Sequence, residues 1–321
     1  MCPPRTGENN SEGVHSIMTT PCSSCPRRCC APRPESRNGA AALPGACRSP
    51  RLPVVARAGL HFWEEPVLSG TRGAGTVFFT GCNLHCVYCQ NYGISSGGAG
   101  EEISVERLRA IYRELAERGA HNLDLVTPTH FVDAVLASLA PAPPLPVVWN
   151  TNGYESVDTL RRLDGKVAIY LPDLKYADDE LGRRYSGVAD YFERATEAIR
   201  EMFRQTGPFE LDGDGMLRHG VVIRHLILPG HVENSLAVIR WVAENFRPGE
   251  VMFSLMRQYL PCGAVDAEHF PELNRRVSEE EYRKVEDALF ASGIEDGFVQ
   301  EAESARSEFI PTFDGSGVLP Q

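Results

Sequence analysis

Six segments with the character of buried strands, each followed by a helical segment, dominate the chain from residue 76 onward. The first helical segment repeats apolar residues on one face, with Leu108, Ile111 and Leu115 in register. Strands that alternate with helices pair in parallel through right-handed crossovers. The expected strand segments are 76–80, 122–127, 146–151, 167–174, 220–228 and 251–256.

Six such units are fewer than the eight that close a barrel, so we expect an α/β fold in the form of a partial (β/α)6 barrel. In such folds the functional side chains gather at the carboxyl ends of the strands. A doubly wound, flat sheet is the structural alternative. The segment LDGDGML (211–217) interrupts the fourth crossover and predicts a hairpin or a loop insertion.

The charge distribution bears on the partners of the protein. The net charge is −11, yet residues 1–60 hold eight Arg against three Glu, which leaves about −16 on the rest of the chain. An acidic body is poorly suited to nucleic acid phosphates, so we expect no nucleic acid partner. The chain has neither a stretch of about 18 apolar residues nor a secretory signal, so we expect a cytoplasmic protein without a membrane partner.

The ten cysteines are unevenly distributed, since nine of them precede residue 90. We expect residues 1–21 to form a disordered tail, 22–55 a cysteine-rich segment, and 56–321 the core domain with a C-terminal extension. In a reducing compartment, clustered cysteines indicate metal ligands or catalytic groups rather than disulfides. A second metal, zinc or an iron–sulfur cluster, is one expectation for the early group, and a redox-inert tail is the other; the candidate ligands are Cys22, Cys25, Cys29 and Cys47.

The segment FFTGCNLHCVYCQNYGIS (78–95) carries Cys82, Cys86 and Cys89 directly after the first expected strand. Their spacing also fits one buried helix face, but the position after a strand indicates a loop. Thiolates suit iron–sulfur clusters and zinc, and a structural zinc site is closed by four ligands. Three cysteines around a cluster of four irons would leave one iron open to another molecule.

The pattern Cys-x3-Cys-x2-Cys, with Tyr88 before the last cysteine, resembles the signature of the radical S-adenosylmethionine (radical SAM) superfamily. The resemblance implies a [4Fe–4S] cluster on these three cysteines, and S-adenosylmethionine bound to the open iron through its amino and carboxylate groups. It further implies an oxidoreductase in which the reduced cluster cleaves S-adenosylmethionine to a 5′-deoxyadenosyl radical that abstracts a hydrogen atom. It also implies a partial barrel of the radical SAM type.

Further segments resemble pyruvate formate-lyase activating enzymes and other glycyl-radical activases, and the whole chain resembles an uncharacterised branch close to them. The segments are SGTRGAG (69–75), WNTNG (149–153), LPDLK (171–175) and GVVIRHLILPG (220–230). The resemblance implies that Asn150, Thr151 and Asp173 lie near the S-adenosylmethionine carboxylate, either alone or around a monovalent cation. It also implies that Lys175 and Arg224 contact the carboxylate or the ribose. The alternatives are a helix cap for Asn150, a surface pair for Asp173 and Lys175, and a structural ion pair for Arg224.

One element departs from the activases. Their Gly-Gly-Glu element, which holds the S-adenosylmethionine amino group, is replaced here by LVTPTHF (125–131). Thr127, Thr129, His130 or the carbonyl groups beside Pro128 would have to replace it. Tyr88 completes the cofactor-binding set that the resemblance implies.

The expected substrate is a glycine of a glycyl-radical partner protein, with electrons from an external reductant such as flavodoxin or ferredoxin. A small molecule or RNA is the alternative substrate, and a zinc-binding interaction protein is the non-enzymatic alternative. No catalytic side chain is assigned.

Two further groups of residues have ordinary structural interpretations. We interpret His61 as a packed histidine and Glu64 with Glu65 as a solvated carboxylate pair, with an acid–base or metal role as the alternative. Three residues near the sixth expected strand could face a substrate cavity or pack in the core; they are Gln258, Tyr259 and Cys262.

Overall fold

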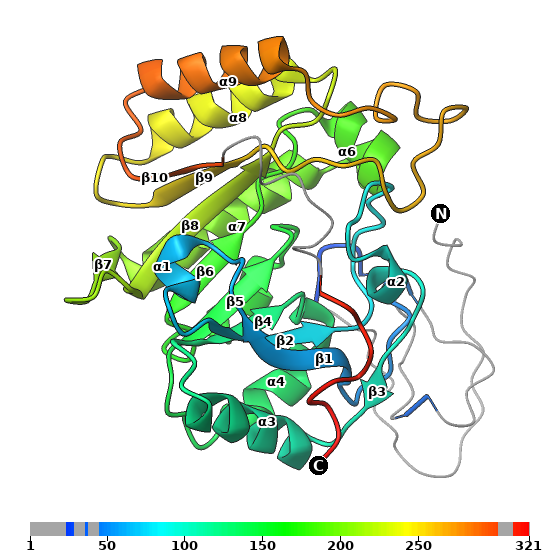
Figure 1. The fold of residues 1–321 in the computed structure, drawn as a ribbon, viewed down its shortest axis with the longest axis vertical. Helices are drawn as coiled ribbons and strands as arrows, with labels where there is room; N and C mark the ends of the chain where they lie inside the picture. Colours follow the sequence, from blue (N-terminus) through cyan, green and yellow to red (C-terminus); the bar gives the residue numbers. More distant parts are fainter. Residues whose placement is uncertain (1–23, 29–35, 38–44, 301–310, 321) are drawn as a thin grey trace, which may run out of the picture.

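A computed structural model describes residues 24–28, 36–37, 45–300 and 311–320 (Figure 1). Within these residues the strands form a ten-stranded sheet in the order β10-β9-β8-β6-β5-β4-β2-β1-β3, with β7 paired to β8. The strands are β1 (Val54–His61), β2 (Ala74–Phe79), β3 (Glu101–Glu102), β4 (Leu123–Val126), β5 (Val147–Thr151), β6 (Ile169–Pro172), β7 (Glu210–Leu211), β8 (Leu217–Leu226), β9 (Met252–Met256) and β10 (Gly297–Val299).

The helices follow the strands in the order that the alternating pattern predicts. They are α1 (Pro66–Ser69), α2 (Tyr92–Ser95), α3 (Val105–Glu117), α4 (Val132–Ser138), α5 (Val157–Arg161), α6 (Asp179–Ser186), α7 (Tyr191–Thr206), α8 (Val232–Asn245) and α9 (Glu279–Ala291), with a 3-10 turn at Thr129–Phe131. Local signals fix where they begin. The Ser104 hydroxyl accepts a hydrogen bond from the Arg107 amide at the start of α3, and Ser278 with Glu281 forms a capping box at α9.

The predicted partial barrel is confirmed. The six expected strands correspond to β2, β4, β5, β6, β8 and β9, and each pairs in parallel with its neighbour. The sheet does not close on itself, because β10 and β3 stand at its two ends. The hairpin at 211–217 is also confirmed, since the Asp212 amide donates to the Met216 carbonyl at 2.8 Å and β7 pairs with β8.

Three strands near the two ends of the sheet, β1, β3 and β10, were not predicted, and the two-residue β3 pairs antiparallel with β1. Strand β1 pairs antiparallel with β2 and so lies outside the strand-then-helix repeat. Strand β10 is a short parallel addition to β9. The segment 311–320 runs beside β1 (Figure 1), where the Ala58 amide donates to the Ser316 carbonyl and the Gly315 amide to the Ala56 carbonyl.

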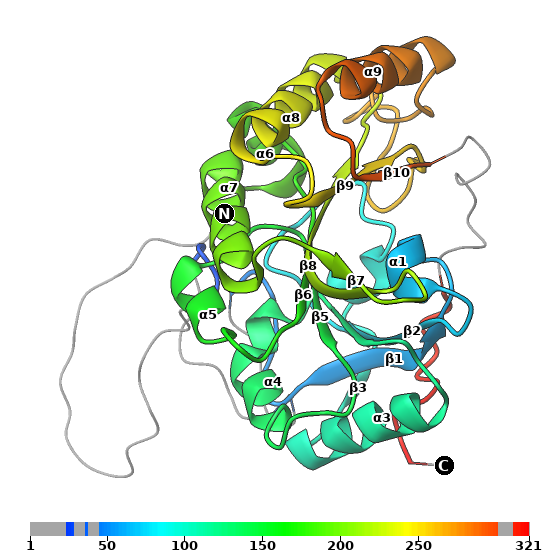
Figure 2. The same ribbon diagram turned by 90° about the vertical axis from the view of Figure 1, so that its left-hand side faces the viewer.

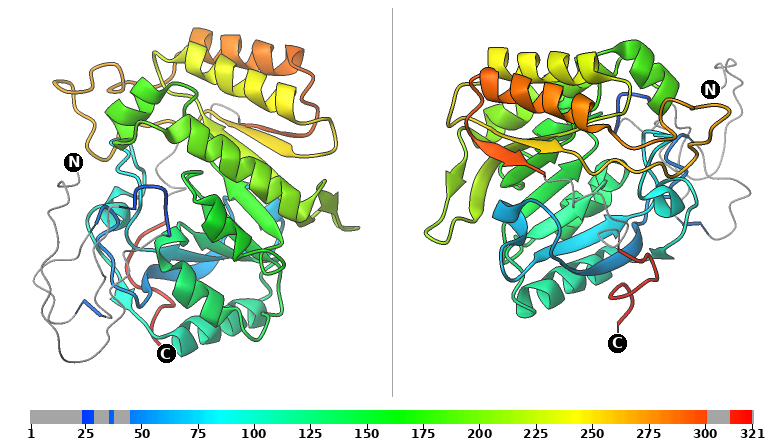
Figure 3. Two further views of the ribbon diagram at one scale, coloured as in Figure 1. Left: turned by 180° about the vertical axis from the view of Figure 1, so that it is seen from behind. Right: turned by 45° about the horizontal axis from the view of Figure 1, so that its top comes forward.

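The two faces of the curved sheet differ in what covers them. Helices α4, α5, α7, α8 and α9 lie on the outer face, whereas α1 lies on the inner face (Figure 2); from behind, α4, α5 and α7 stand in front of the strands (Figure 3). Trp149, Tyr170 and Phe253 belong to the large outer core. Val148, Ile169, Leu171 and other inward residues pack instead with Val67 and Leu68. The apolar α1 thus fills one part of the barrel interior and leaves the strand ends to polar side chains.

Candidate functional site

Cys82, Cys86 and Cys89 lie in the loop between β2 and α2, which we call the three-cysteine loop. No part of it between the three cysteines is helical, so the alternative that they share one face of a helix is wrong. The loop backbone is anchored to α6, since the His85 and Val87 amides donate to the carbonyls of Ser186 and Tyr185. Gly81 opens the loop with a φ of 90°, and a Cβ there would lie 2.5 Å from the Cys47 carbonyl oxygen. Only glycine fits both the conformation and the space.

Each of the three sulfurs has a polar neighbour. Cys82 Sγ accepts from Asn152 Nδ2 at 3.2 Å and from the Leu84 amide at 3.4 Å. Cys86 Sγ shares a hydrogen bond of 3.0 Å with the Ser186 hydroxyl, and the Ser95 hydroxyl donates to Cys89 Sγ at 3.3 Å. Such bonds stabilise sulfur ligands and tune the cluster that they hold.

Burial, with smaller contributions from the neighbouring Cys86 and Cys89, raises the pKa of the Cys82 thiol to about 12. The three thiols therefore interact electrostatically. In the described ranges, no three His, Cys, Asp or Glu side chains converge as ligands of a single metal ion would. An iron–sulfur cluster makes a different demand, because its thiolates bind separate irons. The donor set and its hydrogen bonds fit a cluster held by Cys82, Cys86 and Cys89.

Arg224 is the centre of a polar network on the inner side of the strand ends. Its Nε donates to Asp173 Oδ1 at 2.9 Å, its Nη2 to Asn150 Oδ1 at 2.8 Å and its Nη1 to Glu64 Oε2 at 3.1 Å. Lys175 Nζ donates to the second oxygen of Asp173 at 2.6 Å. The side chains of this network are about 15% exposed or less, so the surface-pair alternative for Asp173 and Lys175 is wrong.

The charges of this network depend on one another. Burial raises the pKa of Asp173, but Arg224 and Lys175 outweigh it and hold that pKa below its ordinary value. Burial lowers the pKa of Lys175, but Asp173 outweighs it and raises the pKa above its ordinary value. Asp173 is therefore a carboxylate between two cations at neutral pH. Asn150, Asp173, Lys175 and Arg224, which the resemblance selected, lie together.

Three carboxyl groups beside this network were missed or misinterpreted from the sequence. Glu64 and Glu65 are buried, so their interpretation as a solvated pair is wrong: Glu64 also accepts from Asn150 Nδ2 at 3.3 Å. Burial raises the pKa of Glu65 to about 7. Asp124 is fully buried, its Oδ2 accepts from Thr76 at 3.3 Å, and its Oδ1 has no hydrogen-bond partner. A charged residue inside the apolar run LDLV was the signal for Asp124.

Thr129, a candidate for the amino group contact, and Thr151, expected near the S-adenosylmethionine carboxylate, both bind a carboxylate of the chain itself. Both hydroxyls donate to Glu155 Oε1 at 2.6 Å, and Trp149 Nε1 donates to the same oxygen at 3.1 Å. Glu155 is 1% exposed, and burial raises its pKa. These two threonines therefore tie the loops after β4 and β5 together through Glu155. Sequence reasoning missed Glu155, although only Tyr154 separates it from WNTNG (149–153).

Thr127 has a strained backbone at the end of β4. Its φ is 56°, in the left-handed region that β-branched residues avoid, and its amide donates to the Asn150 carbonyl at 2.8 Å. The side chain is half-buried. His130 is buried, with Nε2 2.8 Å from the carbonyl oxygen of Thr80, the residue directly after β2. The element that replaces Gly-Gly-Glu thus keeps a backbone conformation suited to glycine.

Tyr88 points into the protein core rather than toward the network. Its hydroxyl shares a 2.6 Å hydrogen bond with Tyr176, and its ring packs near Tyr185 and Tyr259. Cys262 Sγ donates to the Tyr88 carbonyl at 3.3 Å. Only the backbone of Tyr88 is left to face a cofactor.

Three of the remaining candidates have structural contacts. Tyr259 is buried and donates its hydroxyl to the Leu273 carbonyl, and the Gln258 carbonyl accepts from Gln90. The His61 ring lies edge-on to Phe78, and burial lowers its pKa.

The early cysteines are only partly within the described residues. Cys25 and Cys47 are buried, whereas Cys22 and Cys29 lie outside the described residues, as does the expected tail 1–21. Arg27 donates to the carbonyls of Asn83 and Ser186 at 2.6 and 3.0 Å. The described part of the cysteine-rich segment therefore packs on the three-cysteine loop.

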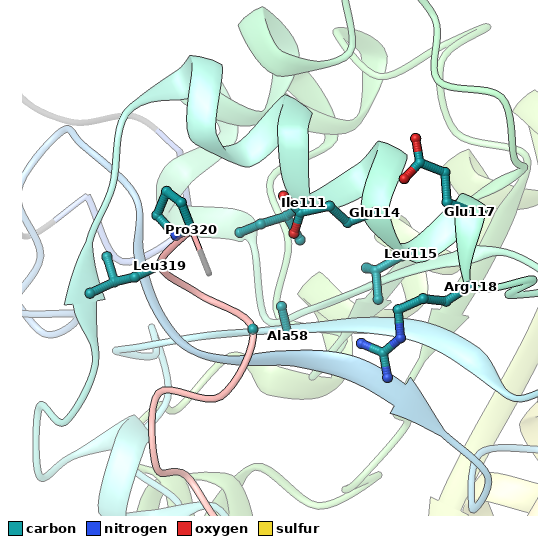
Figure 4. A pocket seen from close by; sticks show the side chains of 9 residues that line it. Ala58, Ile111, Glu114, Leu115, Glu117, Arg118, Leu319 and Pro320 are labelled. Carbon is teal, nitrogen blue, oxygen red and sulfur yellow. The ribbon is translucent and has the colours of Figure 1, made fainter.

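Two pockets lie elsewhere on the surface. One of about 440 Å³ lies between α3 and the segment 311–320 and is lined by Ala58, Ile111 and Leu319 among others (Figure 4). The other, of about 360 Å³, lies between α6, the start of α8 and Glu281. Neither contains a residue of the network or of the three-cysteine loop.

A family model of the Radical SAM superfamily matches residues 76–246, which include the three-cysteine loop and the strand ends that carry the network. The chain belongs to the radical SAM superfamily. It is therefore a radical SAM enzyme by family, and this membership implies a [4Fe–4S] cluster and S-adenosylmethionine as its cofactors. The uncharacterized protein MJ0674 of Methanocaldococcus jannaschii is 30% identical over 235 residues, which cover 70% of this chain and 63% of that protein. The chain thus spans less than two thirds of this relative.

Two of the solved structures with a similar chain path are the following. Streptococcus suis SuiB bound to its precursor peptide SuiA is 12% identical, with a TM-score of 0.46 over 70% of this chain and 47% of SuiB. A domain of a pyruvate-formate lyase-activating enzyme from Bacteroides vulgatus is 14% identical, with a TM-score of 0.36 over 61% of this chain and 91% of the domain. Within the residues that the structure describes, no helix is long and apolar enough to cross a membrane.

Proposed function

We propose that this radical SAM protein binds its [4Fe–4S] cluster through Cys82, Cys86 and Cys89 and activates a glycyl-radical partner enzyme by abstracting a hydrogen atom from a glycine. The observation that carries the proposal is the loop after β2, where three half-buried thiols with polar neighbours precede α2. When bound, the cluster and S-adenosylmethionine supply the reductive cleavage that yields a 5′-deoxyadenosyl radical. An external reductant such as flavodoxin or ferredoxin supplies the electron.

The network around Arg224 is the proposed binding site for the amino acid end of S-adenosylmethionine. Lys175 and Arg224 are the cations that suit a carboxylate, and Asp173 with Asn150 fixes their positions. The half-buried Thr127 offers its carbonyl or hydroxyl for the amino group. Thr129 and Thr151 contribute indirectly, because Glu155 engages both hydroxyls. A monovalent cation beside Asp173 remains part of this proposal.

The chain's own residues also position the site and limit water. Asn150, Asp173 and Arg224 come from β5, the end of β6 and β8, so the parallel register brings them to one edge of the sheet. Their burial lowers the local dielectric, which strengthens every charge interaction that they make with a ligand. The glycine substrate is the part of the proposal that depends on the resemblance to the activases.

Cluster binding and cleavage test the first step. Full-length protein, reconstituted anaerobically, should contain about four irons and four sulfides and should convert S-adenosylmethionine to 5′-deoxyadenosine and methionine when reduced. Replacing any of the three cysteines with Ala should abolish both properties, whereas Cys262→Ala is the matched control and should retain them. Absence of 5′-deoxyadenosine from a fully loaded sample would disprove the proposed chemistry.

Paramagnetic resonance tests the substrate. Reduced, loaded protein is incubated with candidate glycyl-radical enzymes, and a glycine-centred radical on the partner supports the activase role. Production of 5′-deoxyadenosine without any partner radical, but with turnover of a small molecule, would replace that role with the small-molecule alternative.

We also propose that Cys25 and Cys47, with Cys22 and Cys29, bind a second metal. Burial of two thiols in a Pro- and Arg-rich segment supports it, because that segment has few apolar residues of its own to bury them. Metal analysis of a variant that lacks Cys82, Cys86 and Cys89 tests this site separately. Metal-free protein would disprove it. The division into segment 22–55 and core 56–321 stays a proposal.

A further inference from the structure

The segment 311–320 is fastened to the first strand of the sheet by backbone and side-chain contacts. Beside the two backbone hydrogen bonds to β1, Arg57 Nη1 donates to the Thr312 carbonyl at 3.1 Å and pairs with Asp314 at 3.3 Å. Arg107 Nε donates to the Val318 carbonyl at 2.7 Å, and Val318 is fully buried. The segment is thus bonded to both β1 and α3, and a pocket lies between it and α3 (Figure 4).

Phe313 carries this segment to the inner side of the sheet. Its ring lies edge-on to Phe78, with centroids 5.4 Å apart, and packs against a small apolar cluster. The cluster consists of Ala56, Phe78, Ile94 and Val126, so it joins β1, β2, β4 and α2. Phe313 is half-buried and adds one aromatic ring to this small cluster.

The same cluster reaches the three-cysteine loop through α2. Ile94 is 2% exposed, and its carbonyl accepts from the Gly81 amide at 3.0 Å at the start of the loop. The next residue, Ser95, donates its hydroxyl to Cys89 Sγ. The four-residue α2 has few hydrogen bonds of its own, so its position depends on the packing of Ile94.

We propose that Phe313 is a positioning residue for the iron–sulfur cluster. By packing on the apolar cluster it holds Ile94 and Ser95 in place, so that Ser95 donates to Cys89 Sγ. Phe313 thereby helps to set the reduction potential of the iron–sulfur cluster. This inference rests on the proposed function, because it requires a cluster on Cys89. A hydrogen bond to a cluster sulfur stabilises the reduced, more negative state, so the bond raises the potential and its loss lowers it.

Hydrogen exchange of the full chain without its cluster tests the packing step. Phe313→Ala should speed amide exchange in residues 92–97 by about tenfold or more, while β9, which contributes no residue to the cluster, exchanges as before. Phe313→Leu should restore most of the protection, because leucine keeps an apolar side chain there. Leu319→Ala is the matched control, since Leu319 is an exposed residue of the same segment and should change nothing. Unchanged exchange in Phe313→Ala would overturn the proposal.

A redox titration of the cluster-loaded protein, followed by electron paramagnetic resonance, tests the second step. Ser95→Ala and Phe313→Ala should each lower the reduction potential, and the double variant should lower it no further than Ser95→Ala alone. Additive shifts, or an unshifted potential in either single variant, would overturn the assignment. Iron and sulfide analysis of the wild-type protein separates the two proposals: a protein without a cluster refutes the proposed function, and the exchange experiment still decides whether Phe313 positions α2.

Discussion

Nη1 of Arg224 in β8 donates a hydrogen bond of 3.1 Å to the carboxylate of Glu64, which lies 160 positions earlier in the loop before α1. The contact links the inner loop to the far side of the partial barrel. Asp173 and Asn150 accept from the same guanidinium, so one cation holds groups from three other elements of the chain. Removal of this cation would leave buried carboxylates without a partner, which is costly.

Arg224→Gln should therefore lower the free energy of unfolding by about 3 kcal/mol and weaken S-adenosylmethionine binding, because Glu64 and Asp173 lose their shared cation. Urea unfolding and equilibrium binding measure the two effects. Arg162→Gln removes an exposed ion pair with Asp133 and should cost about 0.5 kcal/mol or less. Equal costs for the two variants would show that the network around Arg224 contributes nothing beyond a surface pair.

Glu65 makes stability depend on pH. Burial raises its folded-state pKa from 4.5 to about 7, so between these values the unfolded chain releases a proton that the folded chain retains. The stability of the wild-type protein should then fall as pH rises from about 4.5 to 7 and level off above it. Glu65→Gln has no proton to release.

Urea unfolding at pH 5 and pH 8 measures the Glu65 effect. The free energy of unfolding of Glu65→Gln, relative to that of the wild type, should increase by about 2 to 3 kcal/mol from pH 5 to pH 8. This value follows from about 1.4 kcal/mol per pKa unit. The comparison isolates Glu65, since Asp124 and Asp173 are present in both proteins. An advantage that is the same at both pH values would mean that Glu65 is ionised in the folded protein.

Glu155→Ala should destabilise the protein by about 2 to 4 kcal/mol, because the hydroxyls of Thr129 and Thr151 and the indole of Trp149 would lose one shared acceptor. Glu155→Gln keeps an acceptor oxygen and should cost about 1 kcal/mol. Thermal and urea unfolding give both values. If the two variants are equally unstable, charge rather than hydrogen bonding holds the loops after β4 and β5.

Thr127→Gly should stabilise the protein by about 1 kcal/mol, because glycine adopts a φ of 56° without the strain that a β-branched side chain incurs there. Thr129→Gly is the control in the same turn and should destabilise it, since it removes a hydrogen bond to Glu155. Urea unfolding compares them. Destabilisation by Thr127→Gly would show that contacts of the Thr127 side chain outweigh its backbone strain.

Local sequence determined the repeating part of this protein. The alternation of apolar strands and amphipathic helices predicted β2, β4, β5, β6, β8 and β9, because neighbours along the chain became neighbours in the sheet. It also placed Asn150, Asp173 and Arg224 at adjacent strand ends, and the spacing of Cys82, Cys86 and Cys89 marked the loop after the first of these strands.

Tertiary structure alone decided which polar groups meet. Glu64 looked like a surface carboxylate because its neighbours in sequence are aromatic and acidic, and only the return of the inner loop across the barrel brought it to Arg224. Thr129 and Thr151 were predicted to face a cofactor, yet Glu155 binds both. Phe313 meets the inner side of β2 across more than 200 residues of chain. Periodicity reports the face on which a side chain lies, whereas a long-range partner depends on how the whole chain closes around it.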